Sequence, residues 1–419
     1  MKNLNVLVLA GCFLASSIQL YAGDGSVYSR YGIGDIVDYS SSRISAMGGN
    51  GLALLTGGYV NISNPAALGV LTRTEYSADY QYQGFSMNDG SHTSYLGTGS
   101  IQSAMLAFPV YSEYKITLGF GLTPFSETAY DIRDDETEAG QNITQVFDAS
   151  GGLTSAQFSF SLSPAQDVYL GATFQYIFGH TDYRQRLEYA GSGYFTTDED
   201  RLVSLEGFGA TFGGAVAGID KALGISREKR LTAAATFFTG AKMDAKEERL
   251  ENFITSKETT QVIYGSAKLP IGFALGLMYQ PSEKIILTGD AKFQQWSNYT
   301  YLGVHPAEIR NSSRFGVGAE FSPSAAMGES YYRQVTYRAG TYMNASYLTL
   351  NGEQIKEYFV TGGIGIPMFF APGSEARLNL GLEYGIRGTT SNGLERDNII
   401  RMTVSLSGSD IWFTPSEVE

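Results

Sequence analysis

Apolar and polar residues alternate with period two over many short stretches of this chain. In the clearest stretch, 269–279, the odd-numbered positions are large and apolar, and the positions between them are mostly small. In 377–387, leucine, tyrosine and isoleucine alternate with charged and polar residues. Because successive side chains of a strand point to opposite faces of a sheet, each stretch predicts a β-strand with one apolar face.

Reading every such stretch as a strand predicts about fourteen strands, an even number of the kind that bacterial outer-membrane barrels use. They lie near 74–84, 100–110, 114–123, 153–163, 167–185, 201–218, 229–247, 258–279, 284–296, 312–322, 333–347, 355–369, 376–387 and 394–407. A soluble β-sandwich hides its apolar face in a core and alternates in the same way, so the pattern alone leaves both fold classes open.

The lengths of the connections favour the barrel. Short connections at 111–113, 163–166, 281–283 and 371–374 tend to alternate with long ones at 84–99, 126–152, 187–200, 244–256 and 297–311. Outer-membrane barrels have short periplasmic turns and longer outer loops. If the first strand starts at the periplasm, every long loop falls outside, and Asn351-Gly352 is the one short outer turn.

The chain begins like an exported protein. Residues 1–22 combine a basic start, an apolar stretch and a small residue, Ala22, at a plausible cleavage site. The sequence before Cys12 also resembles a lipidation site, and this alternative stays open beside the favoured plain signal peptide. Cleavage after Ala22 leaves a mature chain without cysteine, so disulfide and thiol chemistry are excluded under that reading.

Composition narrows the class of protein further. No later stretch approaches the ~20 apolar residues of a membrane-spanning helix. The 50 glycines, 28 tyrosines and 24 phenylalanines suit an all-β protein with many tight turns. The formal net charge of −13 argues against a nucleic-acid partner, which would require a basic footprint.

Residues 23–72 lack long alternation and are rich in glycine, serine, asparagine and alanine. This segment is too small to be a confident separate domain, and it could fill a barrel lumen as a plug. The predicted organisation is therefore a signal peptide at 1–22, a plug at 23–72, a transmembrane barrel at 73–413 and a C-terminal tail at 414–419.

Several short motifs share their order with a known family. They are Ser-Arg-Tyr-Gly-Ile-Gly-Asp at 29–35, Ala-Met-Gly-Gly at 46–49, Asn-Ile-Ser-Asn-Pro-Ala-Ala-Leu at 61–68 and Gly-Phe-Gly-Leu-Thr-Pro-Phe-Ser at 119–126. Together they resemble the FadL/TodX outer-membrane transporter family, and the resemblance covers most of the mature chain. The long outer loops do not align with the family.

The resemblance implies a monomeric antiparallel barrel of fourteen strands in the outer membrane of a Gram-negative bacterium, with an N-terminal hatch in its lumen. Members of this family take up long-chain fatty acids or other hydrophobic compounds, including aromatics. The ligand enters the lumen from outside and leaves sideways at an inward kink of the third strand. The expected partners are therefore a hydrophobic small molecule and outer-membrane lipid, without a cofactor.

Five residues belong to the expected hatch. The resemblance assigns Asn64, Pro65 and Ala66 to the hatch motif, in which proline fixes the backbone and asparagine hydrogen-bonds the local chain. An ordinary turn explains these three residues equally well. Gly48 and Gly49 are the expected hatch glycines.

Gly119, Gly121 and Pro124 are candidates for the strand kink, because glycine weakens a strand and proline removes a donor from its ladder. A strand end at the rim of the barrel is an equally good interpretation of Pro124.

Six charged residues occupy positions whose parity points into the lumen: Asp290, Lys292, Arg377, Glu383, Arg387 and Arg401. Some of them could bind the carboxylate of a fatty acid. The favoured alternative is a network of ions that braces the hatch against the wall. Trp296 lies near a strand end, where an aromatic belt at the membrane interface is the expected role.

Catalytic and metal sites find little support. His92, His180 and His305 are far apart in sequence, no pair has metal-ligand spacing, and no Gly-x-Ser-x-Gly motif occurs. The acidic runs at 131–136 and 198–200 match no calcium loop and fit a solvated rim. We therefore expect neither a metal nor an enzyme.

Uptake of hydrophobic compounds is the favoured function. The main alternative is a structural role, because some FadL-like barrels belong to protein-export machinery. A water-filled porin, a soluble β-sandwich and an outer-membrane esterase are more remote alternatives.

Overall fold

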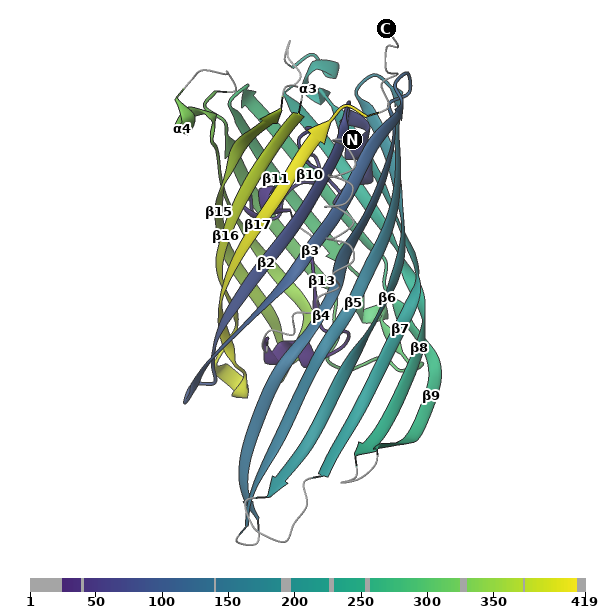
Figure 1. Ribbon diagram of the computed structural model, residues 1–419, viewed down its shortest axis with the longest axis vertical. Helices are drawn as coiled ribbons and strands as arrows, with labels where there is room; N and C mark the ends of the chain where they lie inside the picture. The colour runs from purple at the N-terminus through teal and green to yellow at the C-terminus, as the bar shows by residue number, and fades with distance from the viewer. Residues whose placement is uncertain are drawn as a thin grey trace.

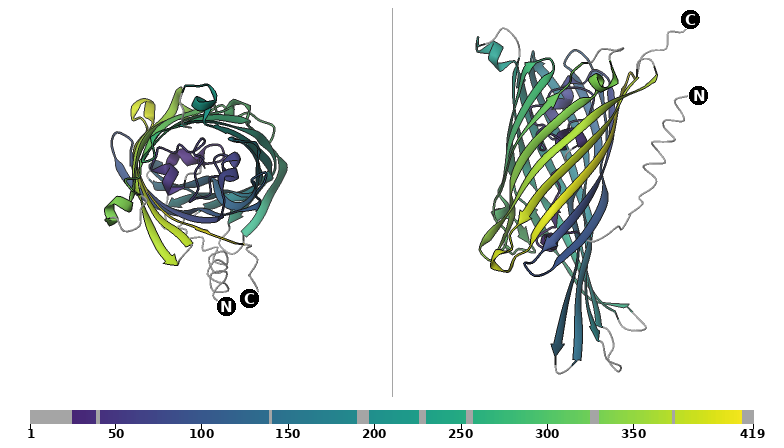
Figure 2. Two further views of the ribbon diagram at one scale, coloured as in Figure 1. Left: turned by 90° about the horizontal axis from the view of Figure 1, so that it is seen from above. Right: turned by 90° about the vertical axis from the view of Figure 1, so that its left-hand side faces the viewer.

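The computed structural model describes residues 25–38, 41–138, 141–189, 197–225, 230–252, 257–324, 330–371 and 374–412. They form a closed antiparallel β-barrel whose lumen holds the N-terminal segment (Figures 1 and 2). The predicted signal peptide, Cys12 and the predicted tail lie outside the described residues. The all-β barrel with an N-terminal segment packed inside it is confirmed.

The wall of the barrel is built from consecutive hairpins. Its strands are β2(Thr74–Asn88), β3(Thr93–Tyr111), β4(Ile116–Glu138), β5(Gln141–Ala165), β6(Val168–Tyr189), β7(Thr197–Ala217), β8(Leu231–Asn252), β9(Lys257–Leu269), β10(Gly272–Ser282), β11(Ile285–Gln294), β13(Ser312–Phe321), β14(Thr336–Leu350), β15(Glu353–Ala371), β16(Ser374–Gly388) and β17(Arg396–Asp410). The wall closes where β17 pairs with β2 along their whole length. Both β9 and β10 pair with β8, so they act as one wall strand, and the predicted fourteen-stranded wall is confirmed.

The remaining elements are short. They are η1(Val27–Arg30), β1(Asp35–Ile36), α2(Ser42–Ser45), η2(Pro65–Val70), α3(Ile219–Ala222), η3(Trp296–Asn298), β12(Thr300–Tyr301), α4(Tyr331–Gln334) and η4(Ser391–Gly393). We call residues 25–73 the hatch. No helix in the described ranges is long and apolar enough to cross a membrane.

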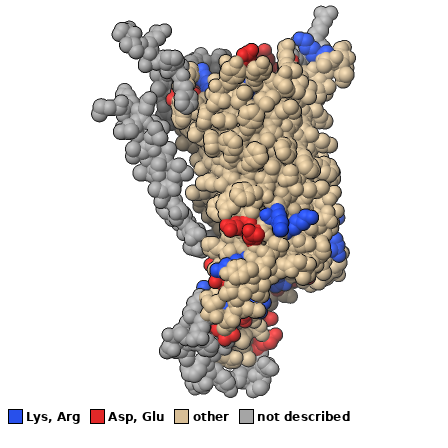
Figure 3. Space-filling view, turned by 90° about the vertical axis from the view of Figure 1, so that its right-hand side faces the viewer, with Lys and Arg blue, Asp and Glu red and all other residues tan. Residues whose placement is uncertain are grey.

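The alternating pattern of β10 appears as predicted. Phe273, Leu275 and Leu277 are exposed on the outside, whereas Ala274 and Met278 are buried against the hatch. The outer surface seen in Figure 3 is largely free of charge over the height of the barrel, as contact with lipid requires. Leu269 departs from the prediction: it is buried, because the strand breaks at Pro270, which has no N–H for the ladder.

Strands β4 to β9 run beyond the rest of the wall and form a projecting sheet, which we call the blade (Figures 1 and 2). It comprises roughly residues 126–138, 141–152, 180–189, 197–205, 242–252 and 257–268. The predicted loop at 126–152 is wrong, because β4 and β5 stay paired up to Glu138 and Gln141. The blade extends beyond the membrane, so its outward-facing positions need not be apolar and its strands lack the regular alternation of the lipid-facing wall. The connections predicted at 84–99, 187–200 and 244–256 are also shorter than predicted, because the strands on both sides extend into them.

The turns at the two ends of the barrel differ. The end opposite the blade carries α3, α4 and the short turns after β3, β5 and β10 (Figure 1). Short turns are periplasmic in outer-membrane barrels, so the blade projects from the cell surface.

A packed apolar core closes the mouth of the barrel at the base of the blade. It joins Tyr28 and Ile33 of the hatch to Leu205 and Met243 of the blade, and to Trp296 of the connection after β11. Trp296 is 2% exposed and stacks on Tyr347 at 4.7 Å between ring centroids. The predicted interfacial role of Trp296 is therefore wrong: its connection folds inward over the lumen instead of lying along the membrane surface.

Candidate functional site: the contacts between hatch and wall

The Asn64-Pro65-Ala66 motif begins η2 at the inner surface of the wall. The Asn64 side chain accepts a hydrogen bond from the backbone N–H of Ala66 at 3.0 Å and donates one to the carbonyl of Leu52 at 2.9 Å. A β-carbon added to Gly213 of β7 would lie 2.1 Å from the Asn64 side-chain oxygen. The motif therefore both caps a helix and packs against bare wall backbone.

Gly48 and Gly49 form the tight turn after α2. Both have left-handed backbone angles, with φ of +72° and +70°. The N–H of Gly48 donates to the hydroxyl of Thr361 on β15 at 2.9 Å, and Arg314 of β13 donates to the Gly48 carbonyl at 3.1 Å. The turn thus binds the wall through its own backbone.

A buried ion cluster joins α2 to the wall. Arg43 donates two hydrogen bonds to the Glu320 carboxylate, both at 2.8 Å, and Arg338 donates to the same carboxylate at 2.7 Å. Arg338 also donates to Asn379 at 2.9 Å. Nearby on β16, Arg377 donates to the hydroxyl of Thr336 at 2.8 Å. The Glu320 carboxylate therefore binds one arginine of the hatch and one arginine of the wall.

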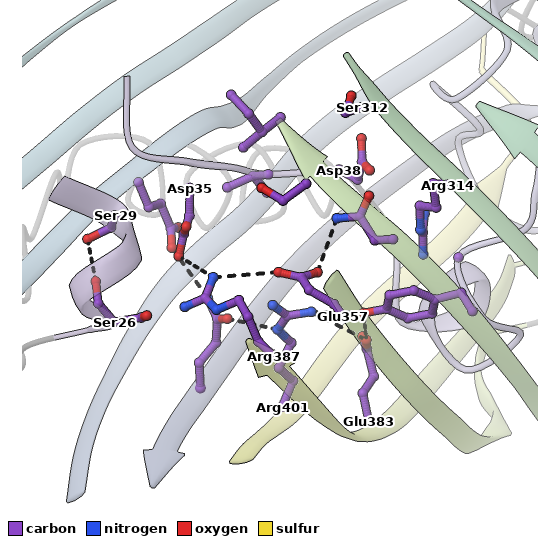
Figure 4. Close-up of a pocket in the computed structure, with 18 of the residues that line it drawn as sticks. Ser26, Ser29, Asp35, Asp38, Ser312, Arg314, Glu357, Glu383, Arg387 and Arg401 are labelled. Carbon is purple, nitrogen blue, oxygen red and sulfur yellow. Dashed lines mark hydrogen bonds and ion pairs between the residues drawn. The ribbon is translucent and has the colours of Figure 1, made fainter. Parts of the chain in front are cut away.

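A second cluster surrounds Arg387 in the outer half of the lumen (Figure 4). Its guanidinium lies 2.8 Å from Asp35 of the hatch, 3.1 Å from Asp397 and 3.6 Å from Glu357. Ser26 of the hatch donates to the fully buried Asp397 carboxylate at 2.6 Å. Three wall strands and the hatch therefore share one arginine-centred site, in which β15, β16 and β17 supply the wall groups and β1 of the hatch supplies Asp35.

Arg401 holds the neighbouring position in Figure 4. It donates to Gln83 at 2.8 Å and to the hydroxyl of Tyr342 at 2.9 Å, and it lies 3.8 Å from the Glu383 carboxylate. Tyr342 in turn donates to Glu383 at 3.0 Å. This group braces the wall strands to one another beneath the hatch.

Lys292 and Asp290 face the hatch from β11. Lys292 forms an ion pair with Asp38 of the hatch. The Asp290 carboxylate accepts the backbone N–H groups of Gly51 and Leu52 at 2.7 and 3.0 Å. The structure thus places all six predicted lumen residues inside the barrel, where each contacts protein groups.

Two of the cavities in the described part of the lumen have volumes of about 140 and 210 Å³, with Asp38, Lys292 and Arg314 in the walls of both. The smaller cavity is lined by polar and charged groups, among them those labelled in Figure 4. The larger one mixes apolar side chains with glutamine, serine and threonine, and it reaches Pro124 and Phe125. Binding sites for drug-sized apolar ligands are usually of ~300–1,000 Å³ and mostly apolar. Both cavities are smaller than this, and the smaller of the two also has mainly polar walls.

The wall is split between β3 and β4. Their pairing stops at Ala104 and Leu122, just before Pro124, and the register between β4 and β5 shifts between Pro124 and Ser126. Beyond this point β1 of the hatch pairs with β4, and Glu127 accepts a hydrogen bond from Ser100 of β3 at 2.8 Å. The hatch and one side-chain contact therefore occupy the split.

The other two kink candidates lie in the paired part of β4. A β-carbon on Gly119 would lie 2.9 Å from Leu68 of the hatch, and one on Gly121 would lie 2.0 Å from the sulfur of Met105. Both glycines leave space for neighbouring side chains, and only Pro124 lies at the split.

Tyr28 anchors the first turn of the hatch by donating to the backbone carbonyl of Glu395. Burial and the nearby Asp397 carboxylate raise the pKa of Tyr28 to about 12. Its hydroxyl therefore remains a hydrogen-bond donor at physiological pH.

Sequence reasoning missed the hatch side of these clusters and several wall partners. The missed residues are Asp35, Asp38, Arg43, Glu320, Arg338 and Glu357. The three hatch residues could have been noticed, since they are charged positions in a segment with few charges. Within the described residues, no group of His, Cys, Asp or Glu side chains is arranged to hold a metal ion.

Comparison with solved structures identifies the fold. The chain is similar to a FadL homologue of Pseudomonas aeruginosa, with 13% identity, a TM-score of 0.58 and coverage of 90% of this chain and 99% of the other. It is also similar to the toluene transporter TbuX of Ralstonia pickettii, with 13% identity, a TM-score of 0.58 and coverage of 89% and 99%. The monoaromatic hydrocarbon channel CymD is also similar, with 12% identity, a TM-score of 0.57 and coverage of 92% of this chain and 100% of the other. No curated protein matches the chain.

These likenesses establish a FadL-like fold, which places the protein in the outer membrane of a Gram-negative bacterium. Such barrels are not enzymes, in agreement with the prediction from sequence. A family model described as BamG matches residues 1–418, almost the entire sequence. The chain with a FadL-like wall and a hatch bound by buried ion pairs therefore belongs to the BamG family.

Proposed function

We propose that this barrel is a structural component of a protein-assembly or protein-secretion complex of the outer membrane. The observation that carries the proposal is the lumen, which is occupied by a hatch held at Asp35, Asp38 and Arg43 by charged wall residues. The smaller cavity beside these contacts has mainly polar walls, whereas an uptake channel for hydrophobic compounds needs apolar surface.

The ion clusters make release of the hatch costly. Removing one partner from a buried ion pair typically costs ~3–5 kcal/mol when the other charge stays buried without compensation. Arg387 and Glu320 each bridge hatch and wall, with side chains 4% and 7% exposed. Each keeps a wall partner of opposite charge when the hatch leaves, so the cost of breaking each contact lies below that range. A route through the lumen would require several such contacts to break together.

The closed outer mouth supports the same proposal. The apolar core around Trp296 and Met243 lies where a ligand from outside would have to enter. The blade, by contrast, offers a broad sheet on the cell surface (Figure 2). The BamG family assignment points to outer-membrane assembly, which agrees with a role in a complex.

Uptake of hydrophobic compounds is the second candidate function. The split at Pro124 favours it, because the larger cavity reaches this point and a lateral exit would need such a gap. The names of the similar structures, a toluene transporter and a monoaromatic hydrocarbon channel, suggest aromatic compounds as the substrate class. On this candidate the barrel works as a monomer with a small apolar ligand.

A disulfide between hatch and wall distinguishes the two candidates. A β-carbon on Gly381 would lie 3.0 Å from the Ser45 hydroxyl oxygen, so Ser45→Cys with Gly381→Cys places two thiols within bonding reach. The cross-link locks the hatch. Each single-cysteine variant and the reduced double variant serve as controls.

We expect the locked protein to support normal levels of other outer-membrane barrels in cells from which the wild-type copy has been removed. Loss of those levels on locking, or no loss on removal of the protein itself, would refute the structural proposal. Toluene or oleate uptake that depends on the protein and stops on locking would establish the second candidate.

A further inference from the structure

The blade is an open sheet and therefore ends in two strand edges, formed by β4 and β9. On the side away from β8, the described residues pair with β9 only at Ala267 and Lys268, through β12. Residues 259–265 thus form an open edge at the right-hand margin of the blade in Figure 1. Such an edge presents a row of N–H and C=O groups that another strand can pair with.

The direction of these backbone groups follows from one hydrogen bond. The Ser266 carbonyl accepts the N–H of Leu302 at 2.9 Å, so the backbone of Ser266 faces away from β8. In an antiparallel sheet both backbone groups of a residue point to the same side, and the side alternates along the strand. Val262 and Tyr264 therefore aim their N–H and C=O groups at the open edge.

Apart from a β-bulge at Thr260, the residues of this edge offer little protection against pairing. Thr-Thr-Gln-Val-Ile-Tyr-Gly at 259–265 contains no charge and no proline, and is rich in β-branched residues. Natural proteins usually protect such edges with charges, prolines or bulges. The Val262 and Tyr264 side chains are 42% and 75% exposed, so a neighbouring strand could pack against both.

The β4 edge is different. Asp131, Asp134, Asp135 and Glu136 crowd its outer part, with Arg133 among them. This composition suits a protected edge, since a strand added beside it would have to accommodate four carboxylates. The contrast within one sheet singles out β9 as the edge that accepts a strand.

We propose that β9 binds an extended, uncharged segment of a partner protein as an additional antiparallel strand at the cell surface. The segment would hydrogen-bond the backbone of Val262 and Tyr264, and would place β-branched or aromatic side chains beside theirs. This inference rests on the proposed structural function and names the kind of partner.

Membrane orientation argues for a different protein and against a second copy. All copies of this barrel share one orientation in the membrane, so their β9 strands all run from the cell surface toward the membrane. Two such edges could meet only in parallel. An antiparallel neighbour needs a strand that runs away from the membrane. The β4 edge of a second copy runs in that direction but carries four carboxylates, so a different protein is the better source of an uncharged strand.

Hydrogen exchange at single amides tests the proposal. The N–H groups of Val262 and Tyr264 should exchange at least about tenfold more slowly in native outer-membrane vesicles than in detergent-purified protein, because an added strand protects them. The matched controls are Asp131 and Asp135 at the β4 edge, whose amides should exchange equally in both preparations. Equal exchange at β9 in the two preparations would overturn the proposal, as would protection that persists in the purified chain.

Two variants complete the test. Tyr264→Pro removes an N–H that faces the open edge and leaves the ladder to β8 intact, so Val262 should lose its protection in vesicles. Tyr264→Val keeps the N–H and should keep the protection. If Tyr264→Pro leaves Val262 protected, the edge is not the binding site. The proposed structural function would then still stand, provided that removal of the whole protein impairs outer-membrane assembly.

Discussion

Arg43 of the hatch and Glu320 of the wall, 277 residues apart in sequence, meet in a two-pronged ion pair with both contacts at 2.8 Å. Glu320 simultaneously accepts from Arg338, so one carboxylate is shared by two guanidinium groups. A single wall side chain therefore links the hatch to two strands of the wall.

Replacement of Glu320 by alanine should lower the free energy of unfolding by ~3–5 kcal/mol, because Arg43 and Arg338 remain buried without a counter-charge. Urea unfolding in lipid vesicles measures the effect. Glu375→Ala is the matched control: this carboxylate is 74% exposed and its pair with Arg73 should contribute less than ~1 kcal/mol. Equal losses in the two variants would contradict the assigned role of Glu320.

Gly213→Ala should loosen the hatch, since the new β-carbon would lie 2.1 Å from the Asn64 side-chain oxygen and push the motif off the wall. Overpacking of this kind costs ~1–3 kcal/mol. Protease cleavage of the hatch within residues 41–72 should become faster than in the wild type. Gly214→Ala, whose β-carbon would make only ordinary contacts at 3.6 Å, should behave like the wild type.

Gly49→Ala should destabilise the hatch more than Gly58→Ala. Both glycines have left-handed angles, φ +70° and +88°, so both variants share a backbone cost of ~1–2 kcal/mol. Only at Gly49 would the β-carbon collide with a side chain, that of Arg314, whereas at Gly58 it would meet open space. Urea unfolding curves of the two variants test this expectation. Identical unfolding midpoints would refute the steric argument.

Trp296→Ala should open the outer mouth. The indole is buried between Tyr299 and Tyr347, and its removal should cost ~3–5 kcal/mol and leave a void. We expect higher single-channel conductance in planar bilayers, with Tyr95→Ala, at a residue that is 77% exposed, as the silent control. Unchanged conductance would show that the seal lies elsewhere along the lumen.

Period-two alternation predicted the wall because lipid and lumen impose opposite demands on the two faces of each strand, as in β10. The blade escaped prediction for the same reason, since beyond the membrane no lipid requires apolar side chains on the outward face of 126–152. Parity correctly directed Asp290 and Arg387 into the lumen. It could not identify their partners, because a contact such as Arg387 with Asp35 depends on where a non-repetitive segment folds. Trp296 was misplaced because nothing in the local sequence reveals that its connection turns inward.

The closure of β17 on β2 also has a consequence for biogenesis. The hatch is continuous with the start of β2, so the ring of strands cannot be completed around an empty lumen and filled afterwards without threading the chain through it. If the hatch lies between the strands when this last pair forms, no chain has to be threaded into a finished ring. Whatever folds this barrel into the membrane then encloses a passenger of about 50 residues, and the ion pairs at Arg43 and Asp35 form as part of closure.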